Sequence, residues 1–200
     1  MRAVPIAALF AVAVAAGDEA TLHERLQAGE AVEVTPAMLP ELLHLVGTLG
    51  LPFAEEEFRA ALGDALRRLG HEAISRHLEE NPSAAVEAYH ALALAGPEGQ
   101  RALVAWLDRN HWPDEVIAAL FRCEEDVVVP PLLERTASGD RHVRGYAFAA
   151  LLAYAWDARL GPALPRGLAG ESRIVRMAAL QAAVLYLDWH DGADLLPLLR

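Results

Sequence analysis

Apolar side chains return along the chain with the period of an α-helix. Residues 141–154 and 173–186 are identical at six of fourteen aligned positions and begin thirty-two residues apart. In both segments the apolar positions fall at i, i+3, i+4, i+7, i+8 and i+11, which is one face of a helix with about 3.6 residues per turn. The pattern therefore predicts two equivalent amphipathic helices.

Three earlier segments fit the same template, so the pattern is a repeat. The copies begin at Phe58, Val86, Val116, Val143 and Val175. A second short apolar helix is expected after each first helix, over residues 71–81, 98–110, 125–137, 161–170 and 193–200. Glycine and proline mark the turns between them, and no segment alternates as a strand does. Because a single helical hairpin cannot bury its own apolar face, neighbouring copies are expected to stack.

One position of the repeat always carries a small side chain. Position i+7 holds Ala65, Ala93, Cys123, Ala150 and Ala182. A small residue at the same place in every copy predicts that adjacent helices approach closely there. The expected fold class is all-α, with the helical hairpins stacked in an α-solenoid.

The unit resembles HEAT repeats, in particular the bacterial HEAT-like kind that includes phycobilisome-lyase-type repeats. The matching start, Asp-x-x-Val-Arg-x-x-Ala, occupies residues 140–147 and has an echo over residues 172–179. A proline in the second helix follows in both copies, at Pro165 and Pro197. The resemblance implies a right-handed superhelix of about five hairpins over residues 53–200, as one continuous domain behind a helical cap over residues 1–52. It implies an architecture rather than an activity.

Charge narrows the range of partners. The net charge is −11, and it is uneven: residues 1–138 hold 10 Arg and 22 acidic residues, whereas residues 139–200 hold 7 Arg and 6 acidic residues. An acidic body repels phosphate backbones, so a protein partner is expected and nucleic acid is disfavoured. The alternative is a nucleic-acid-related protein similar to the alkylpurine DNA glycosylases, which are built from HEAT-like repeats and use tryptophans, an aspartate and arginines on a concave face. Repeat length alone also suggests a lyase or enzyme subunit of the phycobilisome-lyase type.

Five residues are the candidates for binding a partner. Trp112, Trp156 and Trp189 are expected in turns beside acidic residues, and exposed tryptophans are frequent anchors of protein interfaces. Arg141 and Arg173 begin the two most similar helices and would supply the arginine surface of the alternative.

A further set of arginines shares position i+1 of the repeat: Arg59, Arg144 and Arg176. In HEAT-like units this arginine supports a ladder between repeats, here with acids such as Asp140. The alternative is an anion-binding stripe formed together with Arg141 and Arg173.

Catalytic chemistry finds little support in the sequence. Cys123 is the only cysteine, which excludes an intramolecular disulfide, and its place at i+7 predicts a packed side chain rather than a nucleophile. His90 lies on an apolar face and is expected to be a core histidine with a hydrogen-bonded ring. The His-Glu pairs at residues 23–24 and 71–72 resemble those of deoxyhypusine hydroxylases, but two pairs at non-equivalent places do not match that family's four. No catalytic residue, metal ligand or cofactor is assigned.

Both ends of the chain carry an expectation. Residues 1–17 have the outline of a signal peptide, yet Pro5 and Gly17 would equally bound a first helix, which is the interpretation that we prefer, with a cytoplasmic location. At the other end, the leucines of residues 193–200 have no polar closing repeat after them. This end is therefore expected to meet another subunit or partner, or to be followed by further residues in the native protein.

Overall fold

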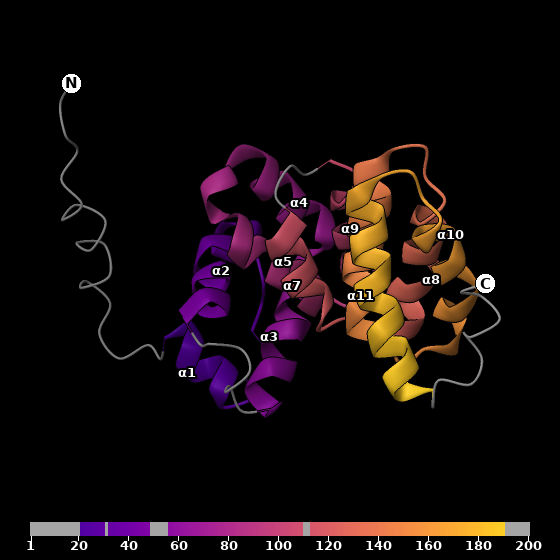
Figure 1. Ribbon diagram of the computed structural model, residues 1–200. Helices are drawn as coiled ribbons and strands as arrows, with labels where there is room; N and C mark the ends of the chain where they lie inside the picture. Colours follow the sequence, from indigo (N-terminus) through magenta and orange to yellow (C-terminus); the bar gives the residue numbers. More distant parts are fainter. Residues whose placement is uncertain (1–20, 31, 49–55, 110–112, 191–200) are drawn as a thin grey trace, which may run out of the picture.

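The chain is all-α, as predicted. The computed structural model describes residues 21–30, 32–48, 56–109 and 113–190, and these ranges contain eleven α-helices, short 3-10 segments and no strand. The expectations for residues 1–17, for Trp112 and for residues 193–200 lie outside the described residues. Figure 1 shows the helices following one another in chain order, from α1 and α2 at one side to α10 and α11 at the other.

The helices form hairpins at the places that the repeat predicts. The first helices of the hairpins are α3 (Glu56–Leu69), α5 (Ala85–Leu94), α7 (Pro113–Leu120), α9 (Arg141–Leu151) and α11 (Arg173–Trp189). The second helices are α4 (His71–Glu80), α6 (Pro97–Trp106), α8 (Glu125–Arg135) and α10 (Leu164–Leu168). Two helices precede them, α1 (Leu22–Gln27) and α2 (Leu39–Thr48).

Short 3-10 segments join several of these helices: η2 (Pro36–Met38), η3 (Pro82–Ala84), η4 (Leu152–Tyr154) and η5 (Ala158–Ala163). The segment η5 replaces the first part of the second helix that was predicted over residues 161–170. Pro162 lies inside η5 and Pro165 at the start of α10. Because proline lacks the backbone donor of a regular helix and crowds the preceding turn, the α-helix is reduced to the five residues of α10.

Helices that are neighbours in the sequence are also neighbours in space. Helix α5 packs against α3, α4, α6 and α7, α6 packs against α7 and α8, and α9 packs against α7, α8 and α11. Buried side chains from Leu22 to Tyr186 belong to one hydrophobic cluster. The described helices therefore share one core that runs along the series of hairpins.

The small side chains at position i+7 lie inside this core. Ala65, Ala93, Cys123, Ala150 and Ala182 are all buried, with exposed fractions of 9% or less. This part of the sequence prediction is confirmed.

The predicted burial of the first apolar position in the second copy is wrong. Val86 is 45% exposed, whereas Phe58, Val116 and Val175 are buried. Helix α5 contacts five other helices, α2, α3, α4, α6 and α7. A helix that is covered on nearly every side is apolar almost all the way round and has no single apolar face. A one-sided template cannot find the outward side of such a helix.

Arginines of the second-helix layer join consecutive hairpins. Each one reaches back 27–33 residues to an acid of the preceding hairpin. The pairs are Arg109–Glu79 at 3.0 Å, Arg135–Asp108 at 2.8 Å and Arg159–Asp126 at 3.1 Å. A ladder between hairpins therefore exists, but these arginines differ from the ones that the sequence suggested.

The arginines at position i+1 have another role. Arg144 and Arg176 each donate two hydrogen bonds from Nη1 to carbonyl oxygens five and six residues earlier, at 2.6–3.0 Å. Asp140 is not a ladder acid either: it caps α9 by accepting a hydrogen bond from the backbone N–H of His142 at 2.7 Å, and that bond lowers the pKa of the Asp140 carboxyl. These residues fix the turns before α9 and α11, which corrects the ladder prediction for Arg144 and Arg176.

Candidate functional site

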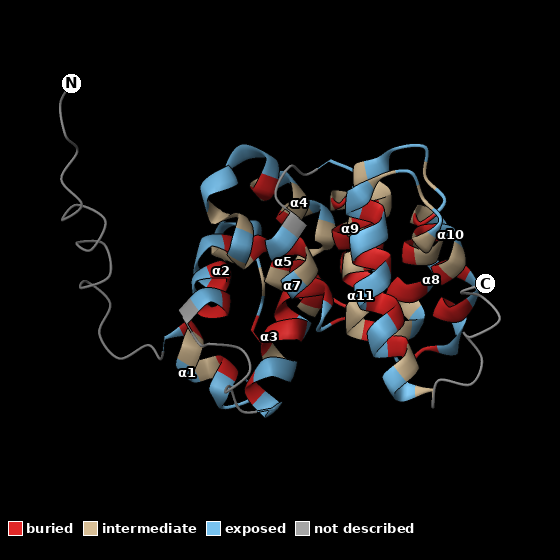
Figure 2. Cartoon of the chain, viewed as in Figure 1, coloured by how far each residue is buried: buried red, intermediate tan, exposed pale blue. Residues whose placement is uncertain are grey.

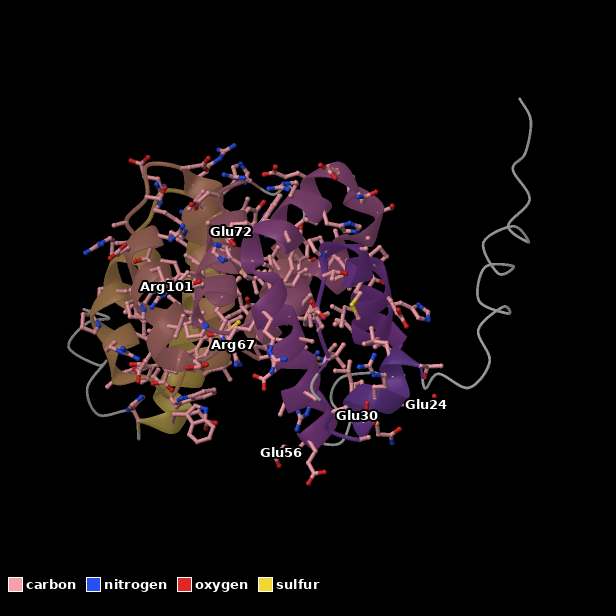
Figure 3. All side chains as sticks on the ribbon, turned by 180° about the vertical axis from the view of Figure 1, so that it is seen from behind. Glu24, Glu30, Glu56, Arg67, Glu72 and Arg101 are labelled. Carbon is pink, nitrogen blue, oxygen red and sulfur yellow. The ribbon has the colours of Figure 1, made fainter. Side chains whose placement is uncertain are left out.

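A groove lies beside Trp106, between helices α4 and α6, and extends onto η3 and the first turns of α5 and α7. It consists of two hollows of about 600 Å³ and about 360 Å³, which share Glu79, Trp106 and Arg109. Figure 3 shows the molecule from behind and labels Glu72 of α4, which lines the smaller hollow. We call this hollow surface the Trp106 groove.

The larger hollow is mainly apolar. Leu78, Ala85, Val86, Tyr89 and Trp106 line it. The rings of Tyr89 and Trp106 meet edge to face, with centroids 6.2 Å apart. Buried Tyr89 and Leu78 thus form the floor of the groove, while half-buried Trp106 and exposed Val86 border it.

Charged groups surround this apolar part. The guanidinium of Arg109 lies 5.6 Å from the centre of the Trp106 ring, and Arg109 Nη1 donates to Glu79 Oε1 at 3.0 Å. In the smaller hollow, Nδ1 of His71 lies 3.4 Å from Glu72 Oε2. The ladder pair and the cation–π contact hold the Trp106 ring in place from one side, so the groove combines a fixed aromatic anchor with a charged rim.

Sequence reasoning missed Trp106. The criterion was a tryptophan in a predicted turn, and Trp106 lies instead at the end of helix α6. The signal that could have found it is the spacing of charges around it: Arg109 follows one turn later, and Glu79 lies thirty residues before Arg109. Neither residue type is unusual enough to stand out without the fold.

Two of the predicted tryptophans come together elsewhere. The rings of Trp156 and Trp189 are 6.2 Å apart at an interplanar angle of 71°, and both side chains are exposed. Nε1 of Trp156 donates to Glu125 Oε2 at 2.6 Å, so the acid that holds it comes from α8 rather than from the adjacent residue. Both tryptophans are exposed, as predicted, and Trp156 lies in a turn. The predicted turn is wrong for Trp189, because α11 continues through this residue.

The predicted arginines lie away from these two tryptophans. Arg141 and Arg173 are exposed at the first residues of α9 and α11, while Trp189 is the last residue of α11. A helix of the length of α11 spans about 25 Å. The candidate residues that the structure describes therefore belong to two separate places, and the arginines do not share a groove with Trp156 and Trp189.

Cys123 is buried and is expected to be unreactive. Burial, together with the charge of Glu124, raises the pKa of its thiol to about 12, so almost no thiolate is present at neutral pH. The native protein should react with a thiol reagent many-fold more slowly than the protein unfolded in urea, and Cys123→Ala should change the free energy of unfolding by less than about 1 kcal/mol. Rapid labelling of the native protein would contradict this description.

His90 gives the fold a pH dependence. Burial lowers the pKa of His90, and the nearby charge of Arg122 lowers it further. Its buried Nδ1 has no hydrogen-bond partner among the described residues, so the expected hydrogen-bonded ring is wrong for this nitrogen. The unfolded chain binds a proton near pH 6.5 more readily than the folded one. The contribution of neutral His90 to stability is thus fully present above that pH and decreases as the pH falls below it.

The variant His90→Leu tests this effect. We expect its free energy of unfolding, measured in urea between pH 7 and pH 5, to change less with pH than that of the wild type. The change should also be neutral or stabilising at pH 5, because it removes a buried polar atom without a partner. An unchanged slope between the two pH values would show that other groups cause the pH dependence.

Comparison of the chain with protein-family models, with curated proteins and with solved structures gives no match. In the part of the chain that the structure describes, no helix combines the length and the hydropathy that a membrane crossing requires. The same residues contain no group of three or more His, Cys, Asp or Glu side chains that could hold a metal ion.

Proposed function

We propose that the protein is a non-catalytic binding module, built as a right-handed solenoid of HEAT-like hairpins, which holds a segment of a partner protein in the Trp106 groove. The Trp106 groove is the observation that carries this proposal. Its smaller hollow lies between the second helices α4 and α6, and its larger hollow extends onto η3, α5 and α7.

Two features support the solenoid. Contacts run between helices that are near in the sequence, which is typical of folds in which each unit touches only its neighbours. The pairs Arg109–Glu79, Arg135–Asp108 and Arg159–Asp126 repeat the same backward connection from hairpin to hairpin. A rigid series of hairpins loses little conformational entropy when a partner binds to its surface.

The lining of the groove defines the chemistry of the partner. The apolar hollow suits a large aliphatic or aromatic side chain, which would pack against Trp106 and Tyr89. Three acidic residues, Glu72, Glu79 and Glu115, line the two hollows against two arginines, Arg76 and Arg109, and the chain as a whole carries a net charge of −11. We therefore expect a peptide segment with an apolar anchor flanked by lysine or arginine.

The nucleic-acid alternative has no comparable support. It requires the tryptophans and the arginines after residue 139 to line one basic groove, whereas Arg173 and Trp189 stand at opposite ends of α11. Arg144 and Arg176 are engaged with the carbonyl oxygens of their own turns. A gel-shift experiment at low salt, where phosphate contacts are strongest, is the direct control.

Selection from a random peptide library tests the proposal. The full-length protein should enrich peptides with an apolar residue flanked by basic residues, and Trp106→Ala should raise the dissociation constant of a selected peptide by about thirtyfold, since a hot-spot residue contributes about 2 kcal/mol. The matched control is Phe121→Ala, which removes an exposed aromatic ring (55% exposed) elsewhere and should leave binding unchanged. Peptides that bind Trp106→Ala as tightly as the wild type, or no enrichment at all, would refute the proposal.

A further inference from the structure

Helix α11 presents an apolar face to solvent. Six of the nine large apolar side chains that are exposed in the described chain belong to this one helix: Ile174, Met177, Leu180, Val184, Leu185 and Trp189, with exposed fractions of 41–63%. Exposed residues follow the whole length of α11 in Figure 2. A continuous apolar strip of this kind marks an interaction surface.

The internal repeat shows which structural element covers a face like that of α11. Thirty-two residues earlier, α9 carries the positions equivalent to Met177 and Leu180, and there both are buried. Phe148 is fully buried where Leu180 is 48% exposed, and Gly145 is buried where Met177 is 49% exposed. Helix α11 itself packs on α9, and Gly145 lies directly beneath Ile174. The face of α11 therefore has the shape of a surface that receives another helix.

The distribution of charge favours a second copy of this chain as the source of that helix. Residues 1–138 carry 22 acidic residues and 10 Arg, but residues 139–200 are nearly neutral. Two copies that join through α11 keep their acidic bodies apart. The face also has opposite charges at opposite ends, with Arg173 at its start and Asp188 near its end, and both side chains are exposed.

We propose that the protein forms a twofold symmetric dimer in which α11 packs antiparallel against α11 of a second copy. A twofold axis near Gln181 brings Arg173 next to the partner's Asp188 and Trp189, and Met177 opposite the partner's Leu185. A parallel pairing would instead place like charges together. Closed twofold interfaces of identical patches are the commonest way in which soluble proteins associate. This proposal does not depend on the Trp106 groove.

Sedimentation velocity of the full-length protein over a range of concentrations tests the dimer. The wild type should sediment as a dimer, and Val184→Glu should sediment as a folded monomer with the far-UV circular dichroism spectrum of the wild type, because Val184 is 57% exposed in the single chain. Its melting temperature should fall only by what the lost association contributes. Phe121→Glu, at an exposed position outside α11, is the matched control and should remain dimeric. A monomeric wild type overturns the proposal. If Val184→Glu also lowers the melting temperature of that monomer, residues 191–200 of the same chain cover the face.

Charge reversal tests the antiparallel arrangement. Arg173→Glu and Asp188→Arg should each weaken the dimer about tenfold, and the double variant should recover most of the lost affinity because it restores opposite charges across the interface. In a Cys123→Ala background, Gln181→Cys should form an intermolecular disulfide under mild oxidation, since it lies near the axis. Additive losses in the double variant, or no cross-link, would overturn the antiparallel dimer.

Discussion

Replacing Phe148 by alanine is expected to lower the free energy of unfolding by about 3–5 kcal/mol. The ring of Phe148 is fully buried at the junction of α9, α10 and α11. It fills the space beside Gly167, where an added Cβ would lie 2.5 Å from Phe148 Cζ. Removing the ring leaves a cavity in the middle of three helices that cannot all move inward. Urea denaturation followed by circular dichroism measures the loss.

The matched control for this change is Phe121→Ala, at a ring that is 55% exposed; it should stay within about 0.5 kcal/mol of the wild type. The variant Gly167→Ala adds a methyl group that collides with Phe148 and with Cβ of Ala179, so alone it should also destabilise. Together, Phe148→Ala and Gly167→Ala should cost less than the sum of the two changes, because the methyl group enters the vacated space. A loss below about 1 kcal/mol for Phe148→Ala would mean that this junction is loosely packed.

The second large effect is expected when a small position of the repeat is enlarged. Ala150→Leu should destabilise the protein by about 1–3 kcal/mol, because Ala150 has an exposed fraction of 0% and α9 is packed against α7, α8 and α11. The added side chain can only be placed by pushing helices apart or by adopting a strained rotamer. Thermal and urea denaturation should both show the loss.

Ala118→Leu is the control for overpacking. It makes the same chemical change on α7, at an exposed position, and alanine and leucine have similar helix propensities. We expect this variant to match the wild type. Equal losses for Ala118→Leu and Ala150→Leu would contradict the idea that the small positions exist to let the helices approach.

Hairpins could be located from the sequence because each copy repeats one local pattern. The second helix predicted over residues 125–137 is α8 at Glu125–Arg135, and the one predicted over residues 71–81 is α4 at His71–Glu80. Burial at Cys123 and at the equivalent alanines followed from the same periodicity. The pattern failed at Val86, since the outward side of an enclosed helix depends on how many neighbours surround it.

Contacts between hairpins could not be predicted in the same way. Nothing local in the sequence distinguishes Arg109, which reaches Glu79, from Arg144, which binds carbonyl oxygens of its own turn. Likewise, the meeting of Trp156 and Trp189 depends on how η4 and the end of α11 lie against each other. Such pairs arise from the angle between stacked units, and that angle is set by side chains from several helices at once.

The arginine–carboxylate pairs between hairpins also differ from lysine pairs in how they respond to alkaline solution. Every one of the three is made by a guanidinium, and the chain contains no lysine. Guanidinium groups keep their charge far above the pH at which ammonium groups lose theirs. Burial also raises the pKa of Cys123 and of Tyr154, so both groups stay neutral at moderately alkaline pH. The three ion pairs should therefore persist in carbonate buffers near pH 10, at which lysine side chains begin to lose their charge.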